Sequence, residues 1–380
     1  MTLLHSRFAL TGLVGLAAAA FTAPALADDA LQLSGFASVV AGKVLSGDRT
    51  EPYFRYDCPC FIADYSHGAL YSERWQAKQE SKVGVQGTYT FSPKLSATAQ
   101  VVGRGVDGVK ADLEWAYASY DVNDSWTVQV GRKRLPIYYY SDFQDVGFAY
   151  TWVRPPADLY GWEIVNYNGA NATYRGDWAG WAAKANFFFG SENSRNNLMQ
   201  RIYYDTPQNV KWKNIVGGDL VLTRGVLTTR ATYIQSDVQQ WDRSTGERVT
   251  PATDSPKSAE KQRIYGLSAN IDWHDWMVRS EYSVFDRHGY SYRSQAYMLG
   301  IGRRVGDFTG LITRTNYRER NTFAPNGQQH DSGYSATLRY ELNGSTAVKL
   351  QWDRFRDMSG ADLSYVGNSR LLSVSLDTVF

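Results

Sequence analysis

The chain has 380 residues, a formal net charge of +2 and an aromatic content of 14%. A charge this close to neutral gives no bulk attraction to nucleic acid, so no nucleic-acid partner is expected. After Ala27 no stretch reaches the roughly 18 consecutive apolar residues of a membrane-spanning helix, which excludes a bundle of such helices.

Residues 1–27 have the pattern of a signal peptide. Arg7 supplies the positive charge, Phe8–Ala20 is the apolar core, and Ala25-Leu26-Ala27 fits the small-x-small cleavage rule. We expect residues 28–380 to be exported as a single domain, because no Pro/Ser-rich linker divides them. The two cysteines then lie in an oxidising compartment.

The rest of the chain consists of alternating apolar and polar runs, which have the period of β-strands. Turn-rich gaps separate the runs, and most gaps alternate between short and long. We predict about sixteen antiparallel strands, with both chain ends on the side of the tight turns. The predicted strands are Leu31–Val40, Gln76–Thr90, Lys94–Arg104, Lys110–Tyr120, Ser125–Gly131, Ala170–Arg175, Gly180–Phe189, Lys211–Thr223, Val226–Ser236, Gln262–Trp273, Trp276–Phe285, Tyr292–Arg303, Asp307–Tyr317, Gly333–Tyr340, Thr346–Phe355 and Asn368–Phe380. The predicted tight turns are Ser92-Pro93, Val122-Asn123-Asp124, Gly176-Asp177, Arg224-Gly225, His274-Asp275, Val305-Gly306 and Leu342–Ser345.

One face of these strands is apolar and the other carries charges. Clear examples are Leu267–Trp273, Tyr334–Tyr340, and the set Leu113, Trp115 and Tyr117 opposite Asp112 and Glu114. A soluble sandwich hides its apolar faces inside, whereas a membrane barrel turns them toward lipid. Periodicity alone does not separate the two arrangements.

Three features favour the barrel: the alternation of short and long gaps, the Ala, Gly and Thr residues on the apolar face, and aromatic residues at strand ends, where a lipid interface holds them. These aromatic residues are Trp126, Trp162, Trp178, Trp273, Trp276, Phe308, Tyr340 and Phe380. A sheet in hydrocarbon must have no open edge, so the last strand is expected to pair with the first.

The third long gap carries the most specific local sequence. It contains Val130-Gly131-Arg132, Lys133-Arg134-Leu135-Pro136, Tyr140-Ser141-Asp142, Asp145–Tyr150 and Trp152-Val153-Arg154-Pro155-Pro156. Together with the strand pattern, this gap resembles the third-loop region of the Gram-negative general porins, and Ser375–Phe380 is similar to their last strand.

The resemblance implies an all-β transmembrane barrel in the outer membrane of a Gram-negative cell. It also implies a homotrimer whose third outer loop folds into the lumen. The implied partners are outer-membrane lipid, lipopolysaccharide and the barrel assembly machinery, for which Phe380 would be the assembly signal.

We expect the third loop, from about Arg134 to Gly161, to form the pore constriction, because loops this long inside a compact fold are usually functional. If it folds inward, its charged side chains face the opposite wall, and opposed charges across a narrow water column select solutes by size and charge. Strand parity points Lys82 and Arg104 inward, and Arg132 as well if Gly131 forms a β-bulge. The candidate loop residues are Asp142, Asp145, Arg154 and Asp158, with Glu163 just after the loop.

Cys58 and Cys60 form a C-x-C pair in the first long gap. Such a pair makes a small disulfide or supplies two thiolates to a metal. His67 is the one imidazole nearby in the sequence, which is too few ligands for a closed zinc site. We therefore expect a local disulfide and no metal.

We expect a porin that passes small hydrophilic solutes and ions by passive diffusion, with no cofactor and no enzymatic activity. After the predicted signal peptide the sequence has only four histidines, His67, His274, His288 and His330, and it lacks the common hydrolase, zinc-protease and P-loop motifs. The alternatives are a substrate-specific channel, a barrel enzyme whose site assembles from distant strands, and a secreted soluble β-protein that binds glycans.

Overall fold

The computed structural model of the protein describes residues 30–49, 58–203, 207–250, 260–287, 292–320, 328–359 and 367–380. The predicted signal peptide, residues 1–27, lies outside the described residues.

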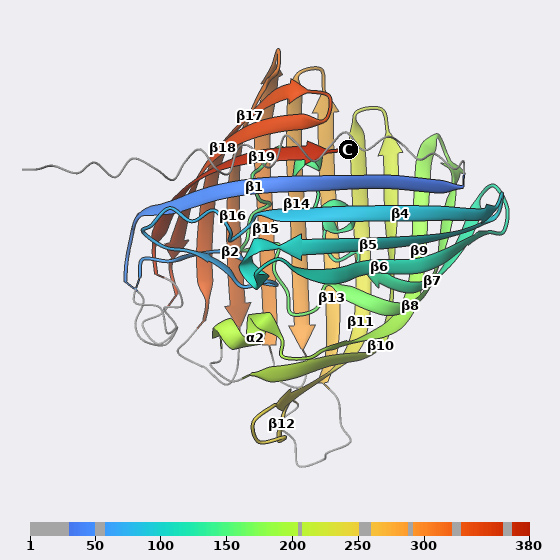
Figure 1. The fold of residues 1–380 in the computed structure, drawn as a ribbon, viewed down its shortest axis with the longest axis horizontal. Coiled ribbons are helices and arrows are strands. Elements are labelled where there is room, and N and C mark those ends of the chain that lie inside the picture. The colour runs from blue at the N-terminus through green and yellow to red at the C-terminus, as the bar shows by residue number, and fades with distance from the viewer. Residues whose placement is uncertain are drawn as a thin grey trace, which may run out of the picture.

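The main sheet is a closed antiparallel barrel (Figure 1). It has 17 strands, of which the three-residue β12 (Arg248–Thr250) pairs with β11 alone among the described strands, and the other 16 close the barrel. Each of the predicted strands overlaps one of them. The barrel strands are β1 (Leu31–Gly47), β4 (Lys82–Ser92), β5 (Leu95–Arg104), β6 (Lys110–Asp121), β7 (Trp126–Arg134), β8 (Asn166–Trp178), β9 (Trp181–Ser194), β10 (Gln208–Arg224), β11 (Leu227–Asp242), β13 (Glu260–Trp273), β14 (Trp276–Arg287), β15 (Tyr292–Val305), β16 (Phe308–Arg320), β17 (His330–Asn343), β18 (Thr346–Asp357) and β19 (Ser369–Val379).

The first and last strands close the barrel, as the sequence predicted. β1 pairs with β19 from Phe36 opposite Val379 onward, and with β4 on its other side. Gly35 and Phe380 exchange two backbone hydrogen bonds of 2.7 and 3.0 Å. A Cβ atom at Gly35 would lie 2.4 Å from Cζ of Phe380, so only glycine leaves room for this ring.

Tight turns join the strands at one end of the barrel, and both chain ends of the described barrel lie there. The amide of Thr90 donates to Ala30, and the amide of Val379 donates to Ser345, each beside a tight turn. One predicted turn was misplaced. β8 and β9 continue past Gly176-Asp177 to a two-residue turn at Ala179-Gly180, which adopts φ values of 49° and 78°. The pair formed by Trp178 and Trp181 extends the ladder to this turn.

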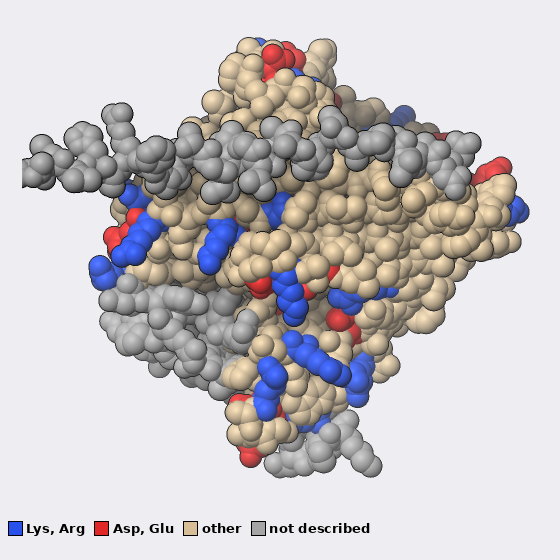
Figure 2. All heavy atoms as spheres, in the orientation of Figure 1, with Lys and Arg blue, Asp and Glu red and all other residues tan. Residues whose placement is uncertain are grey.

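The apolar face of the strands points outward. Leu267 is 58% exposed and Ile312 is 68% exposed, whereas inward neighbours such as Ser268 and Thr313 are buried. Figure 2 shows a broad uncharged surface over the strands, with charged side chains gathered toward its margins. This distribution fits a wall that faces hydrocarbon and excludes two sheets that bury their apolar faces against each other.

A β-bulge corrects the predicted faces of β6. The register between β5 and β6 shifts between Gln100 and Val101, opposite Glu114. The shift turns Trp115 and Tyr117 inward, where they line hollows with Asp142, while Leu113 stays 48% exposed. The prediction that all three residues share the outer face was wrong, because the extra residue reverses the alternation beyond it.

β4 begins at Lys82 rather than at the predicted Gln76. Gln76 instead forms an isolated bridge with Gly42 of β1, with reciprocal backbone hydrogen bonds of 3.0 and 2.9 Å. Residues 72–81 therefore belong to the first long connection.

The long connections carry the remaining elements. They are the hairpin β2 (Phe61–Asp64) and β3 (Ala69–Tyr71), the short 3₁₀ helices η2 (Gly105–Asp107), η3 (Ser141–Phe143) and η4 (Gly147–Ala149), and the helix α2 (Leu198–Tyr203). Among the described residues, no helix is long and apolar enough to cross a membrane.

Candidate pore constriction

The connection between β7 and β8, residues 135–165, contains nearly all of the predicted third loop and is hydrogen-bonded to inward-facing side chains from distant strands. Arg230 of β11 donates to the carbonyls of Tyr138 and Tyr139 at 3.2 and 3.1 Å. Arg339 of β17 donates to the carbonyls of Phe148 and Tyr150 at 2.7 and 3.0 Å. Further contacts come from Glu281 of β14, Thr313 of β16, Lys349 of β18 and Ser373 of β19. This segment therefore lies against the inner faces of these strands.

Aromatic side chains hold the segment against one side of the barrel. Trp152 is 1% exposed, donates from Nε1 to Thr313 at 2.9 Å, and meets the ring of Tyr140 edge-on at 5.4 Å. Tyr138 and Tyr160 stack at 4.6 Å in the same cluster. The cluster is completed by apolar residues of β10, β11, β13, β14, β15 and β16. The segment is therefore packed in a hydrophobic core and is not a solvent-exposed loop.

Trp162 belongs to this packing and not to the lipid interface, where the sequence placed it. It is 6% exposed, and its ring lies 4.1 Å from that of Phe285. Its position near a strand end suggested an aromatic residue at the lipid interface. The segment that carries it is instead packed inside the barrel. The other predicted girdle tryptophans, Trp126, Trp178, Trp273 and Trp276, are exposed.

Asp145 contacts Lys82 and Arg104, which are two of the predicted wall cations. It accepts hydrogen bonds from Arg104 and Arg134 at 2.9 and 2.7 Å, and one of its oxygens lies 3.5 Å from Nζ of Lys82. Glu114 bridges the same two arginines at 2.7 and 3.1 Å. Burial opposes ionisation of Asp145, but the guanidiniums of Arg104 and Arg134 outweigh it and hold the pKa of this carboxyl well below its usual range. The opposed charges thus meet in direct contact, not across open water.

Asp142 is the most exposed of the predicted loop acids. Its side chain is 45% exposed and lies 3.7 Å from Nη1 of Arg230. Arg230 also pairs with Asp219 of β10 at 3.2 Å. Asp142 therefore presents a carboxylate to solvent beside a cation that is already partly neutralised.

Arg154 is a buried residue that links the segment to its surroundings. It is 4% exposed, binds Glu80 through two nitrogens, and donates to Asp353 at 2.5 Å and to Ser373 at 2.6 Å. Burial opposes its charge, but Glu80 and Asp353 raise the pKa of this guanidinium above its usual value. This residue ties the segment to the first long connection and to two barrel strands.

Asp158 and Glu163 lie in separate buried contacts. Asp158 accepts a hydrogen bond from the hydroxyl of Thr315, and burial raises the pKa of its carboxyl to about 6. Glu163 accepts from Trp212 at 3.0 Å and forms an ion pair with Arg287. Neither acid is among the partners of Asp145, so the predicted acids do not form one group.

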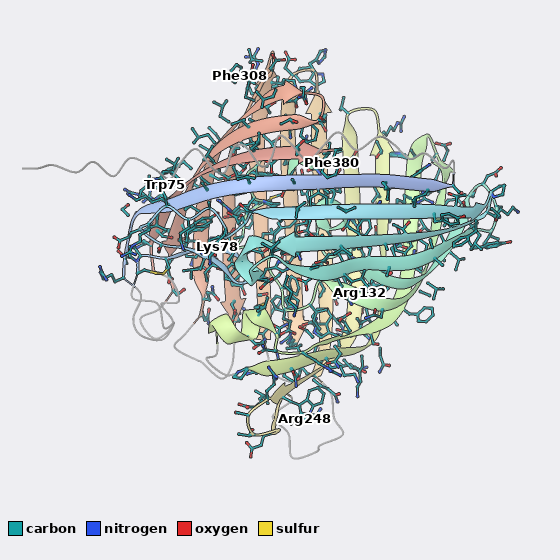
Figure 3. All side chains as sticks on the ribbon, in the orientation of Figure 1. Trp75, Lys78, Arg132, Arg248, Phe308 and Phe380 are labelled. Atoms are coloured by element: carbon teal, nitrogen blue, oxygen red, sulfur yellow. A yellow bond between two sulfur atoms is a disulfide. The ribbon has the colours of Figure 1, made fainter. Side chains whose placement is uncertain are left out.

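Arg132 is not brought to the loop acids. No register shift interrupts the ladders at Gly131, and Arg132 shares the face of Ala116 and Val130, the latter 59% exposed. Its guanidinium binds Glu192 of β9 at 2.6 Å and the carbonyl of Leu113 at 2.8 Å (Figure 3). The bulge occurs at Glu114 instead, one strand away.

The first long connection packs against the same segment, which sequence reasoning missed. Tyr71 of β3 is fully buried beside Gly42 and Arg154, and Ser66 exchanges two hydrogen bonds with the backbone of Trp162. Cys58 and Cys60 are joined in a disulfide just before this hairpin. The short apolar runs Phe61–Ala63 and Ala69–Tyr71, which flank a turn at Gly68, were the available signal.

Asp64 and His67 fix the turn of this hairpin. Asp64 accepts from the His67 ring at 2.7 Å and from its amide at 3.1 Å. Burial opposes ionisation of Asp64, but His67, Lys82 and Arg104 together lower the pKa of its carboxyl to about 2. In the described part of the chain, no three His, Cys, Asp or Glu side chains are grouped as a metal site would require.

Of the hollows beside the segment, the two larger ones described here both include Trp115, Arg134 and Asp142. The larger, of about 550 Å³, reaches the rim of tight turns and is lined by polar residues such as Gln86 and Gln100. The smaller, of about 220 Å³, lies against β6 to β11. Water has room on this side of the barrel, next to the exposed carboxylate of Asp142.

Comparison with known proteins places the chain among channel-forming barrels. A family model described as Gram-negative porin matches residues 13–359. A search of curated proteins finds no match. Solved structures with a similar fold include the outer membrane channel DcaP of Acinetobacter baumannii, at 9% identity and a TM-score of 0.61 over 92% of this chain and 97% of that one.

Two further solved structures share the fold at similarly low sequence identity. An anion-selective porin from Comamonas acidovorans has 14% identity and a TM-score of 0.56 over 92% of this chain and 99% of that chain. The outer membrane protein OmpT of Vibrio cholerae, in a trimer form, has 9% identity and a TM-score of 0.53 over the same shares.

Proposed function

This chain belongs to the Gram-negative porin family and forms an outer-membrane channel, and from this premise we propose that it admits small hydrophilic solutes by passive diffusion. The proposal includes no cofactor and no chemical turnover. The observation that carries it is a closed barrel with an apolar outer face, polar inner residues, and hollows beside an inward-packed segment. A general pore is favoured over a substrate-specific one, because the charged residues that line the larger hollow, Arg134, Asp142 and Asp145, include both signs.

We propose that residues 135–165 narrow the channel and that their charged residues have two different roles. Arg154 and Glu163 are buried, Asp158 is partly buried, and all three hold the segment in place. Lys82, Arg104 and Arg134 fix Asp145 against the wall. Asp142 is left as the acid that acts on passing ions, because its carboxylate is exposed and lines both hollows.

Planar-bilayer recording tests both statements. The reconstituted protein should conduct, and Asp142→Lys should shift the permeability ratio toward anions, since a charge at a narrow point acts over about a Debye length. Asp272→Lys is the matched control, because Asp272 is exposed beside the His274-Asp275 turn and bound to Arg279. A folded protein without conductance would remove the channel role. An unchanged ratio in Asp142→Lys would remove Asp142 from the constriction.

We further propose a homotrimer that is inserted by the barrel assembly machinery and surrounded by lipid and lipopolysaccharide. Support for the trimer comes from the family and from the trimer form of the similar Vibrio cholerae protein. Phe380 is 47% exposed at the seam between β1 and β19, where a recognition factor can reach it. Native mass spectrometry should give three chains per particle, and Phe380→Ala should lower the amount of folded protein in the outer membrane.

A further inference from the structure

The smaller hollow contains more basic than acidic side chains. Five bases and two acids line it. Two of the bases are neutralised, Arg134 by Glu114 and Asp145, and Arg230 by Asp219. Among the described residues, the other three, Lys133, Arg175 and Lys184, have no carboxylate within 4.0 Å. The hollow therefore has an excess of positive charge that the described protein does not compensate.

Strand register places two of these bases directly opposite each other. Arg175 of β8 pairs with Lys184 of β9, and both side chains face the hollow. Like charges in directly opposed positions destabilise a sheet unless something lies between them. The hydrogen-bond partners of Arg175 and Lys133 are uncharged, since Arg175 donates to Thr127 and Lys133 binds Gln129. The acids of the same hollow, Asp142 and Asp219, form no ion pair with Lys133, Arg175 or Lys184. An anion from solution is the partner that would relieve this repulsion.

Aromatic rings lie beside the cations. Trp115 and Tyr117, turned inward by the bulge at Glu114, have ring centroids 6.3 Å apart. Nζ of Lys133 lies 4.9 Å from the centroid of Tyr117, and Tyr167 forms part of the same wall. At about 220 Å³ the hollow is smaller than a typical ligand pocket, so it suits a molecule with one ring.

We propose that this hollow is a binding site for small aromatic carboxylates, of which benzoate is the simplest. The carboxylate lies between Arg175 and Lys184, where charge-assisted hydrogen bonds are available from both strands. The ring lies against Trp115 and Tyr117. The inference rests on the proposed channel function in one respect only, which is that solutes reach the site through the lumen.

Calorimetry on the folded, detergent-solubilised full-length protein tests the site directly. Benzoate should bind, cyclohexanecarboxylate should bind several-fold more weakly because it lacks an aromatic face, and benzylamine should not bind. Lys184→Met should weaken benzoate binding about tenfold, since a hydrogen bond to a charged group is lost. Lys94→Glu is the control, because Lys94 is exposed in the β4–β5 turn outside the hollow. Heat-dependent electrophoretic mobility shows that each variant is folded.

The same samples in planar bilayers separate this inference from the proposed function. In the parent protein benzoate should interrupt the current, and Lys184→Met should show fewer and shorter interruptions. A conducting channel to which benzoate does not bind, or binds equally well in Lys184→Met, overturns the site and leaves the channel. Benzoate binding without conductance supports the site and removes the channel. Equal affinity for benzoate and cyclohexanecarboxylate overturns the aromatic part of the proposal.

Discussion

The two sides of the inner barrel wall carry different kinds of side chain. From β4 to β9 the inward residues include charged groups and a ladder of neutral hydrogen bonds, in which Gln100 donates to Gln86 at 3.1 Å and Asn171 donates to Gln129 at 3.1 Å and to Asn186 at 3.0 Å. From β10 to β16 the inward residues include a buried apolar set covered by the segment 135–165. That set is Val210, Trp212, Ile215, Ile234, Val238, Ile264, Phe285, Ala296, Met298 and Leu311.

This difference shows how one barrel holds both a core and a water path. The apolar side makes it favourable for the segment to pack inward, because its aromatic rings leave water there. The amides of the other side bond to one another across strands, and its charged groups face the hollows, so water can reach this side. The lumen of a barrel is therefore polar on average without being polar everywhere.

Removing the cation of Arg154 should cause the largest loss of stability. Arg154→Met leaves the largely buried carboxylates of Glu80 and Asp353 without their cation, and breaking such a pair costs about 3–5 kcal/mol. Urea unfolding in lipid vesicles, followed by tryptophan fluorescence, measures the loss. Adding Glu80→Gln and Asp353→Asn to Arg154→Met should restore most of it. If the triple variant is as unstable as the single one, the ion pairs are not what holds the segment.

Opening the aromatic side should cost nearly as much and should also change the channel. Trp152→Ala removes a ring that is 1% exposed, and such truncations cost about 3–5 kcal/mol. Single-channel conductance should rise as the segment loosens. Trp178→Ala is the matched control, because Trp178 is 67% exposed at the β8–β9 turn. Equal effects of the two changes would mean that the segment is not held by its packed side.

Asp158 should make stability depend on pH within a defined window. Its folded pKa of about 6 lies above the ordinary value of 3.8, so the folded state holds the proton more tightly. Stability should therefore fall by about 3 kcal/mol as pH rises from 4 to 6, and stay level above that. Asp158→Asn should remove this slope while keeping the bond from Thr315. An identical pH profile in both proteins would place the Asp158 carboxyl in water, outside the packed side.

The sequence was sufficient for the barrel but not for the division of its interior. Period-two alternation sets which residues share a face, and the requirement for closure sets the pairing of β1 with β19. The bulge at Glu114 could not be anticipated, because one extra residue in a ladder leaves no mark in composition. It turned Trp115 and Tyr117 inward. On β7 the ladders continue without a shift at Gly131, and Arg134, not Arg132, is the arginine that contacts Asp145.

The partners of the loop acids could not be predicted from the sequence either, because most of them lie far away in the chain and are brought close only by the fold. Lys82 and Arg104, which parity points inward, both reach Asp145. Nothing in the sequence distinguished the exposed Asp142 from the partly buried Asp158 and the buried Glu163, since all lie in one irregular stretch. Once strand faces are known, however, inward apolar residues such as Met298 and Leu311 mark the side on which a loop will pack.

The smallest effect should come from the amide ladder. Gln100→Ala removes a side chain that is 7% exposed, comparable in burial to many core residues, yet it lines the larger hollow. Water can replace its hydrogen bond to Gln86, so the loss should stay within about 1 kcal/mol. The same urea titration that detects Trp152→Ala measures it. A loss as large as that of Trp152→Ala would mean that the ladder is dry, and the contrast between a packed side and a wet side would no longer hold.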